Sequence, residues 1–153
     1  MDITWESKRF SECTADDVFE FSKLRTDIFF VEQQCNEEEL DSWDRHPGTD
    51  HVWAKVGDQM VGYARVVRRD VGEPIDQGIT TSIGRVVVDK DFRGQGIAND
   101  LVAKCLELTE GEDVVLHAQE YVTALYARNG FEEFGEPFDE AGIVHRRMLR
   151  RAQ

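Results

Sequence analysis

Residues 88–100 read VDKDFRGQGIAND and join a strand-like run to a helix-like run. Two glycines, Gly94 and Gly96, stand just before the point where the helix would begin. The first backbone N–H groups of a helix have no partner within the helix, so they can bind an anion, and glycine removes the Cβ that would hold a phosphate away. This stretch therefore predicts an anion-binding turn between a strand and a helix.

Two common phosphate-binding motifs do not fit this turn. The dinucleotide fingerprint GxGxxG requires a third glycine, and Asn99 occupies that position. The nucleotide P-loop requires a Lys followed by Ser or Thr, and no such pair follows the glycines. A P-loop is therefore excluded, and a dinucleotide-binding turn is disfavoured.

The segments before the turn predict one helix and three strands. Thr14 to Asp17 resembles a capping box, and an apolar stripe at helical spacing follows it, so a first helix should run to about residue 30. The stripe consists of Val18, Phe21, Leu24 and Ile28. Residues 34–50 and 70–78 are polar and contain Gly and Pro, which is typical of loops, and the first loop has room for one short helical turn. The predicted strands are 51–56, 60–68 and 80–88, with a hairpin turn at 57–59.

The segments after the turn alternate between helices and strands. A helix of about three turns should start at Ile97 and end near Gly111, which offers a left-handed residue. Residues 114–118 are nearly all apolar, as in a strand that is buried on both faces. A further helix is predicted at 121–129 and a final strand at 143–150. This order predicts a mixed α/β layout, and we expect the whole 153-residue chain to form a single domain.

The chain is strongly acidic. Its 31 Asp and Glu against 18 Lys and Arg give a formal net charge of -13. A broad anionic surface would be repelled, so neither a nucleic acid nor an acidic membrane is expected as a partner. Arg outnumbers Lys by 13 to 5, which together with the acidity would suit a high-salt cytoplasm, and ordinary acidic solubility explains it equally well.

Cysteine usage and hydropathy indicate a reducing, aqueous compartment. Cys13, Cys35 and Cys105 form no CxxC pair and leave one cysteine over, so neither a disulfide framework nor a zinc site is indicated, and no metal is expected. Charges interrupt the start of the chain, and no apolar run approaches the roughly 18 residues of a membrane span. We therefore expect a cytoplasmic protein that does not associate with membranes.

The glycine turn resembles a known motif. Arg93-x-x-Gly96-x-Ala98 matches the Q/R-x-x-G-x-G/A signature of the GCN5-related N-acetyltransferase (GNAT) superfamily. Residues 124–131, ALYARNGF, resemble a later helix of that superfamily and its Y-x-x-x-G-F ending. The strand before the turn and the helix after it are the context in which the superfamily carries this signature.

Motifs from about residue 20 to about residue 150 look like the ElaA-type branch of this superfamily. They are Leu24 to Cys35, Glu39 to Asp44, Thr49 to His51, Tyr63 to Arg65, Ile83 to Val88, His117 to Gln119 and Gly142 to His145. The resemblance implies an α/β (α+β) fold whose central, mostly antiparallel sheet is splayed where two middle strands part, with the acyl donor in the split. It also implies transfer of an acetyl group from acetyl-CoA to an amine by direct attack on the thioester. The resemblance does not name the acceptor, and we expect a small-molecule amine or a protein N-terminus.

The resemblance further implies roles for individual residues. Backbone groups of Val86 and Val88 would hold the pantetheine arm as a strand-like partner. The turn would hold the pyrophosphate of acetyl-CoA, and Asn129 would contact the cofactor or cap its own helix. The turn consists of Arg93, Gly94, Gln95, Gly96, Ile97 and Ala98. Tyr126 would give a proton or a hydrogen bond to the departing CoA thiolate, which a phenol with an ordinary pKa of about 10 can do.

The general base is not assigned by the sequence. An amine must lose a proton before it attacks a thioester. Many relatives carry a Glu near the start of the strand that here reads TSIGR, residues 81–85, and this chain has no acid there. The substitutes are Glu32, His51, His117 and Glu120, or water, and each of these side chains could instead have a purely structural role.

Two other functions remain open. The pattern of Arg25, Phe29, Asp41, Asp44, Arg65 and Arg85 resembles the charged cluster of acyl-homoserine-lactone synthases, although those proteins are longer and lack the glycine turn. A non-catalytic CoA-binding regulator is the other alternative, because no base is assigned. Within the cluster, Arg65 and Arg85 either form ion pairs with the aspartates or clamp a substrate carboxylate. A homodimer is left open.

Overall fold

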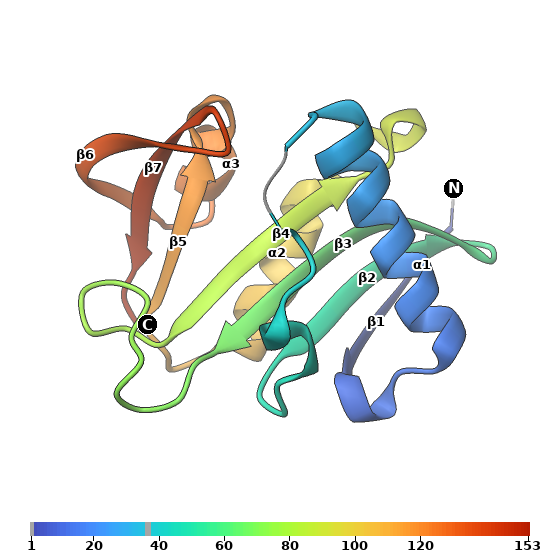
Figure 1. Ribbon diagram of the computed structural model, residues 1–153, viewed down its shortest axis with the longest axis horizontal. Helices are drawn as coiled ribbons and strands as arrows, with labels where there is room; N and C mark the ends of the chain where they lie inside the picture. Colours follow the sequence, from blue (N-terminus) through green and yellow to red (C-terminus); the bar gives the residue numbers. More distant parts are fainter. Residues whose placement is uncertain (1, 36–37) are drawn as a thin grey trace.

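The fold is built on a mixed, seven-stranded sheet, which Figure 1 shows in the computed structural model. The structure describes residues 2–35 and 38–153. The strands are β1 (Ile3–Arg9), β2 (Asp50–Val56), β3 (Gln59–Arg68), β4 (Thr81–Val88), β5 (Val114–Gln119), β6 (Glu132–Glu140) and β7 (Ile143–Arg150). Their order across the sheet is β1-β2-β3-β4-β5-β7-β6. All neighbours are antiparallel except β4 and β5, which are parallel.

Two longer helices cover opposite faces of the sheet (Figure 1). They are α1 (Ala15–Thr26) and α2 (Ile97–Leu108), and the short α3 (Thr123–Ala127) follows β5. The remaining helical turns are η1 (Phe10–Glu12), η2 (Asp27–Glu32), η3 (Ser42–Arg45), η4 (Lys90–Phe92) and η5 (Glu120–Val122). A mixed sheet with flanking helices confirms the predicted α/β (α+β) class. The helix predicted at 121–129 is shorter than expected and consists of η5 and α3.

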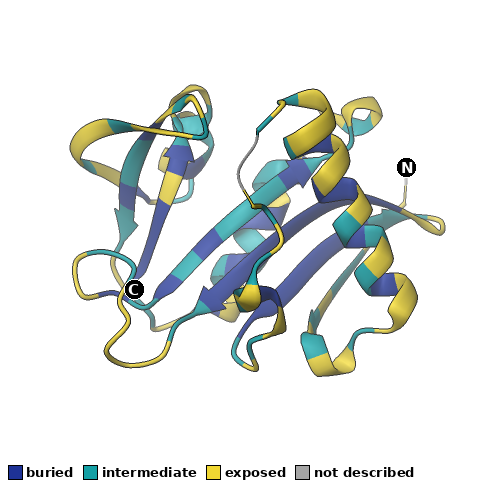
Figure 2. Ribbon diagram, viewed as in Figure 1, coloured by how far each residue is buried: buried dark blue, intermediate teal, exposed yellow. Residues whose placement is uncertain are grey.

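The buried core has one layer on each face of the sheet, and the central strands are mostly dark blue, that is buried, in Figure 2. Successive side chains of a strand point to opposite faces, so neighbouring residues of β3 enter different layers. Ala64 packs with Leu101 of α2, and Tyr63 packs with Phe21 of α1. The central strands β2 and β3 are buried along most of their length, which gives the site a rigid support.

Helix α1 begins as predicted and ends earlier. The Thr14 hydroxyl accepts a hydrogen bond from Asp17 N (3.0 Å), and the Asp17 carboxylate accepts one from Thr14 N (2.9 Å), which is the predicted capping box. The regular helix stops at Thr26, and Asp27–Glu32 form a π-helical turn. The expectation of one helix to about residue 30 is therefore corrected. Such wide turns are frequent at functional sites, and here Ile28 reaches the cleft described below.

A β-bulge reorients the middle of β4. Tyr63 pairs with Val87 and Arg65 pairs with Gly84, so β4 carries one residue more than β3 between these pairs. Arg85 lies in the extra stretch with a positive φ of 54°. In a regular strand Ile83 and Val87 would lie on the same face, because they are four residues apart. The bulge shifts this alternation, so that Ile83 packs on the α2 face of the sheet and Val87 on the α1 face. Bulges of this kind often lie beside active sites, where they redirect side chains.

The sheet is split between β4 and β5. Within the described residues the two strands pair at Ser82 and Val115 alone. Beyond that pair the strands diverge, as Figure 1 shows between the yellow-green β4 and the orange β5. The split leaves one edge of β4 without a neighbouring strand.

The two edge strands were not predicted from the sequence. β1 and β6 lie at the two ends of the strand order. β6 contains Gly135 and Pro137, which argue against a central strand but are tolerated at an edge, because the edge lacks a second neighbour. The strand predicted at 114–118 also differs from expectation, since His117 is exposed while Val115, on the same face of β5, is buried.

Candidate active site

A cleft of about 970 Å³ opens where β4 and β5 part. Side chains and backbone of both strands line it, together with residues from the glycine turn, from α3 and from the chain that follows α1. Of the residues predicted to bind the cofactor or to act in catalysis, those that line the cleft are Val86, Val88, Arg93, Gly94, Gly96, Ile97, Ala98 and Tyr126. The structure therefore brings most of the predicted site residues to one cavity.

The glycine turn presents bare backbone to the cleft. Gly94 and Gly96 have φ angles of +79° and +81°, which non-glycine residues rarely adopt. A Cβ added at either position would meet no atom within 4 Å, so both face open space. Gly96 is the N-cap of α2, whose first N–H groups point outward from there. Gln95 is exposed and does not line the cleft.

The free edge of β4 is suited to bind an extended chain. Asp89 N donates to Val61 O of β3 (2.8 Å), so the backbone groups of the alternate residues Val88 and Val86 face the split. An extended molecule in the split could pair with these groups as an added strand would. The Val88 carbonyl accepts a hydrogen bond from Arg93 Nε (3.1 Å).

Arg93 and Glu32 form an ion pair at the mouth of the cleft. The Arg93 guanidinium lies 2.9 Å from the Glu32 carboxylate, and both side chains are more than one third exposed. Glu32, a candidate base, is therefore the partner of a cation. Because the pair is exposed, an anionic ligand can compete for Arg93 at small cost.

Tyr126 lies in the wall of the cleft that α3 provides. Its ring packs edge-on against Phe131 with centroids 6.0 Å apart, and only 7% of the residue is exposed. Its hydroxyl has no hydrogen-bond partner in the described part of the chain, so it is available to a ligand. Burial raises the pKa of Tyr126, and the Cys105 thiol adds to the rise, so the phenol keeps its proton at neutral pH. Its neighbour Leu125 is only half-buried, so Tyr126 is the more deeply placed of the two.

Asn129 lies outside the lining of the cleft. Its side-chain amide donates to Leu125 O (2.9 Å) and to the side-chain oxygen of Asn99 (3.0 Å). It thereby ties the end of α3 to the first turn of α2, next to the glycine turn. A contact between Asn129 and the cofactor stays a prediction.

Two of the four candidate bases lie away from the cleft. His51 is fully buried, and its Nε2–H donates to Asp44 O (2.9 Å) while Nδ1 accepts from the Tyr63 hydroxyl (2.7 Å), because a carbonyl can only accept. Burial lowers the pKa of His51 despite the hydrogen bond from its ring to Asp44. Glu120 is exposed and is absent from the cleft lining. Neither side chain therefore lines the cleft.

His117 lines the cleft and has an acidic partner. Its Nε2 lies 3.5 Å from the Asp76 carboxylate, which also lies 3.2 Å from Arg147 Nε. The edge of Phe138 packs against the imidazole at 5.1 Å. Asp76 therefore orients the ring so that Nδ1 is the nitrogen left for a ligand. No sequence pattern pointed to this partner, because Asp76 comes from a loop and meets His117 only through the fold.

Arg25 anchors a buried charge cluster beside the cleft. The Arg25 side chain is 0% exposed, and it binds the Asp44 carboxylate (2.7 Å) and the Glu39 carboxylate (2.9 Å). It also donates to the Glu39 carbonyl. The cluster thereby ties Glu39 and Asp44 to helix α1.

Arg65 and Arg85 extend this cluster to the cleft. Arg65 binds Asp41 (2.7 Å) and Asp44 (2.9 Å), and Arg85 lies 3.4 Å from Asp41. Burial by itself would raise the pKa values of both aspartates, but the neighbouring arginines outweigh it and hold them below the ordinary value. Of the two alternatives for these arginines, the structure shows the ion pairs.

Two absences concern the described residues. No group of three or more His, Cys, Asp or Glu in residues 2–35 and 38–153 could hold a metal ion. None of the helices in those ranges is both long and apolar enough to cross a membrane.

A sheet that opens between two parallel strands above a glycine turn defines the acyltransferases that take their acyl group from an acyl-CoA. Residues 13–151 match the acetyltransferase (GNAT) domain family, and the chain belongs to that family. Protein ElaA from Escherichia coli is 31% identical over 153 residues, covering 97% of this chain and 96% of ElaA. The predicted family and ElaA-like branch are therefore confirmed, and the protein is an acyltransferase.

Solved structures agree with this assignment. The crystal structure of E. coli ElaA has a TM-score of 0.87 at 29% identity and covers 98% of this chain and 100% of that chain. An acyl-CoA N-acyltransferase from Pseudomonas aeruginosa has a TM-score of 0.86 at 31% identity, covering 97% and 99%. The CoA-dependent acyl-homoserine lactone synthase BjaI has a TM-score of 0.75 at 19% identity and covers 97% and 82%, which shows a shared fold alone.

Proposed function

We propose that the protein transfers an acetyl group from acetyl-CoA to the nitrogen of an amine, as one domain that spans the whole chain. The observation that carries this proposal is the split between β4 and β5, where a cleft connects the bare backbone of Gly94 and Gly96 to the unbound hydroxyl of Tyr126. The pyrophosphate would bind at residues 93–98, and the pantetheine arm would pair with the free edge of β4. The thioester would then lie in the split.

The two faces of the split sheet suit the two proton transfers. Leu116 and Ala118 of β5 pack in the α2 layer with Tyr126, whereas His117 between them points to the α1 side. The amine would approach from the α1 side and give its proton to His117. The neutral nitrogen would then bond to the thioester carbon, the C–S bond would break, and the thiolate would take the proton of Tyr126. The nitrogen would lose its second proton to solvent water, which would return one to the Tyr126 phenolate, so that an amide and the CoA thiol result. Acid and base thus lie on opposite sides of the reacting carbon.

Removing the Tyr126 hydroxyl tests the acid. Tyr126→Phe should bind acetyl-CoA as tightly as the parent and should lower the acyl-transfer rate at least about 10-fold, because the hydroxyl acts only in the transition state. The measurement is release of the CoA thiol with an acceptor that turns over well, together with calorimetry of acetyl-CoA binding. A rate within about twofold of the parent would make Tyr126 a core aromatic and leave water to protonate the thiolate.

Changing His117 tests the base. His117→Gln should lower kcat about 10-fold or more near neutral pH, and the loss should shrink as the pH rises toward the pKa of the amine, because a free amine needs no base. Glu120→Gln serves as the control and should keep the parental rate, since Glu120 lies outside the cleft. A loss that is the same at every pH would assign His117 to packing or binding.

The assay also separates the alternatives. A non-catalytic regulator would bind acetyl-CoA and release no thiol with any amine. An acyl-homoserine-lactone-synthase-like enzyme would release thiol with a longer acyl-CoA and would form a lactone product. Comparing acetyl-CoA with longer acyl-CoA donors across a panel of amines, at low and high salt, decides between these functions.

A further inference from the structure

Arg69 lies in the cleft without an ionic partner among the described residues. It follows the last residue of β3, and its backbone N–H donates to Thr80 O (2.8 Å), so the β3–β4 pairing continues through it. Its side chain lines the cleft on the acceptor side, together with Trp43. In the described part of the chain, its guanidinium has no hydrogen bond, and its Nε is buried without a partner.

This is unusual for an arginine on this face of the sheet. Arg65 and Arg85, which reach the same cleft, both bind carboxylates. The chain has 31 acidic residues against 18 basic ones, so an unpaired guanidinium is not due to a shortage of acids. A buried donor without a partner is destabilising, and such a group in a cavity indicates a missing ligand atom or water.

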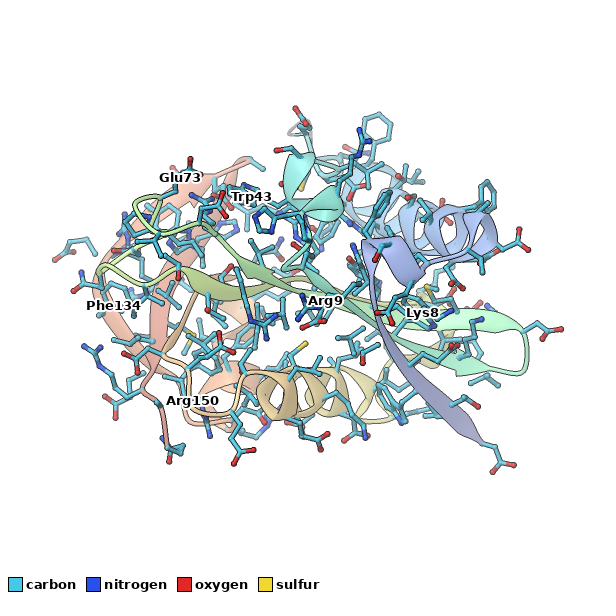
Figure 3. The ribbon with its side chains drawn as sticks, turned by 90° about the horizontal axis from the view of Figure 1, so that it is seen from below. Lys8, Arg9, Trp43, Glu73, Phe134 and Arg150 are labelled. Carbon is cyan, nitrogen blue, oxygen red and sulfur yellow. The ribbon has the colours of Figure 1, made fainter. Side chains whose placement is uncertain are left out.

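Trp43 holds the guanidinium in place. Arg69 Cζ lies 5.1 Å from the centroid of the Trp43 ring, which is a cation–π contact. The backbone of Trp43 is fixed in turn, because its N–H donates to the Asp41 carboxylate (3.1 Å) and its carbonyl accepts from the Thr49 hydroxyl (2.6 Å). Figure 3 shows Trp43 on the side of the sheet opposite α2, which is the side from which the amine would approach.

We propose that Arg69, supported by Trp43, binds a carboxylate of the acceptor, so that the acceptor is an amine that carries its own carboxylate. This inference rests on the proposed function, because it assigns a substrate class to the same cleft. A guanidinium presents two parallel N–H groups that match the two oxygens of a carboxylate. Glu38 lines the same cleft, and its charge disfavours a doubly charged phosphate more than a singly charged carboxylate.

The register of the sheet sets the size of the acceptor. Arg69 is level with Thr80, Ser82 pairs with Val115, and His117 lies two residues further along β5. At about 3.3 Å per residue and about 4.8 Å per paired strand, the Cα atoms of Arg69 and His117 are separated by at least roughly 16 Å, because β4 and β5 diverge beyond the Ser82–Val115 pair. Both side chains shorten this span, but an α-amino acid is still too short to reach both. The acceptor is therefore an amine whose carboxylate lies several bonds away, such as an ω-amino acid or a short peptide.

The test compares acceptors that differ in their charged group and in their length. Thiol release from acetyl-CoA is measured with 6-aminohexanoate, its carboxamide, its phosphonate analogue and glycine, using the full chain. The kcat/KM for 6-aminohexanoate should exceed the kcat/KM for each of the other three acceptors at least about 10-fold. Arg69→Gln should remove that preference by lowering kcat/KM for 6-aminohexanoate about 10-fold or more, while the carboxamide changes less than about twofold.

Arg45→Gln is the matched control, because Arg45 is exposed, lies in the same helical turn as Trp43 and does not line the cleft. It should behave as the parent does with every acceptor. Equal use of the carboxylate and the carboxamide by the parent, a preference for the phosphonate or for glycine, or an equal loss on both acceptors in Arg69→Gln would overturn the inference. So would acetyl-CoA binding without turnover of any carboxylate-bearing amine. Absence of acetyl-CoA binding would instead overturn the proposed function.

Discussion

Gly96→Val should lower the affinity for acetyl-CoA by about 100-fold or more. The variant places a branched side chain over the N–H groups that would hold the pyrophosphate, and two lost hydrogen bonds to a charged group account for a change of that size. Its φ of +81° also strains any residue with a Cβ. Calorimetric titration with acetyl-CoA measures the effect directly.

Gly57→Val separates lost binding from strain. Gly57 has a φ of +60° in the turn between β2 and β3, and an added Cβ there meets no atom within 4 Å, as at Gly96. It is absent from the lining of the cleft. We expect Gly57→Val to lose about as much thermal stability as Gly96→Val does. Its affinity for acetyl-CoA should stay at the parental value. Unchanged affinity in Gly96→Val would place the pyrophosphate elsewhere.

Arg25→Met should lower the free energy of unfolding by about 3 kcal/mol or more. The Arg25 side chain is fully buried, and its removal leaves the Glu39 carboxylate without its cationic partner. It also removes one of the two arginines that neutralise the charge of the Asp44 carboxylate. Breaking a buried ion pair from one side typically has this effect, because an uncompensated charge remains in a medium of low polarity. Urea denaturation followed by circular dichroism measures the change.

Lys23→Met provides the comparison on the surface of the same helix. Lys23 and Asp27 form an exposed ion pair at 2.8 Å. Water and salt screen such pairs, so little measurable change is expected. If Arg25→Met and Lys23→Met lowered the free energy of unfolding by the same amount, the buried cluster around Arg25 would contribute no more to stability than an exposed ion pair does.

The periodic elements could be predicted from the sequence, since their patterns are local. The capping box at Thr14 and the apolar stripe located the start of α1, and Ile143–Arg150 was predicted to the residue. The glycine turn was found because its chemistry lies within six consecutive residues. Edge strands such as β6 lack a second neighbour and tolerate Gly and Pro, so their sequence resembles a loop.

The rest of the site depends on contacts between distant segments. The positive φ of Arg85 is imposed by the bulge opposite β3, and nothing in its own sequence demands it. Asp76 meets His117 across 41 positions, and Trp43 meets Arg69 across 26. His51 was a candidate base by its residue type alone, and only the fold shows that both of its ring nitrogens are engaged.

A crystal structure of the complex with acetyl-CoA is the most direct test of acyl transfer in the split sheet. We predict the pyrophosphate at the backbone of residues 93–98, the pantetheine arm beside Val86 and Val88, and the thioester in the split with its sulfur within hydrogen-bonding reach of the Tyr126 hydroxyl. Acetyl-CoA bound outside the split, or with its sulfur remote from Tyr126, would contradict this placement.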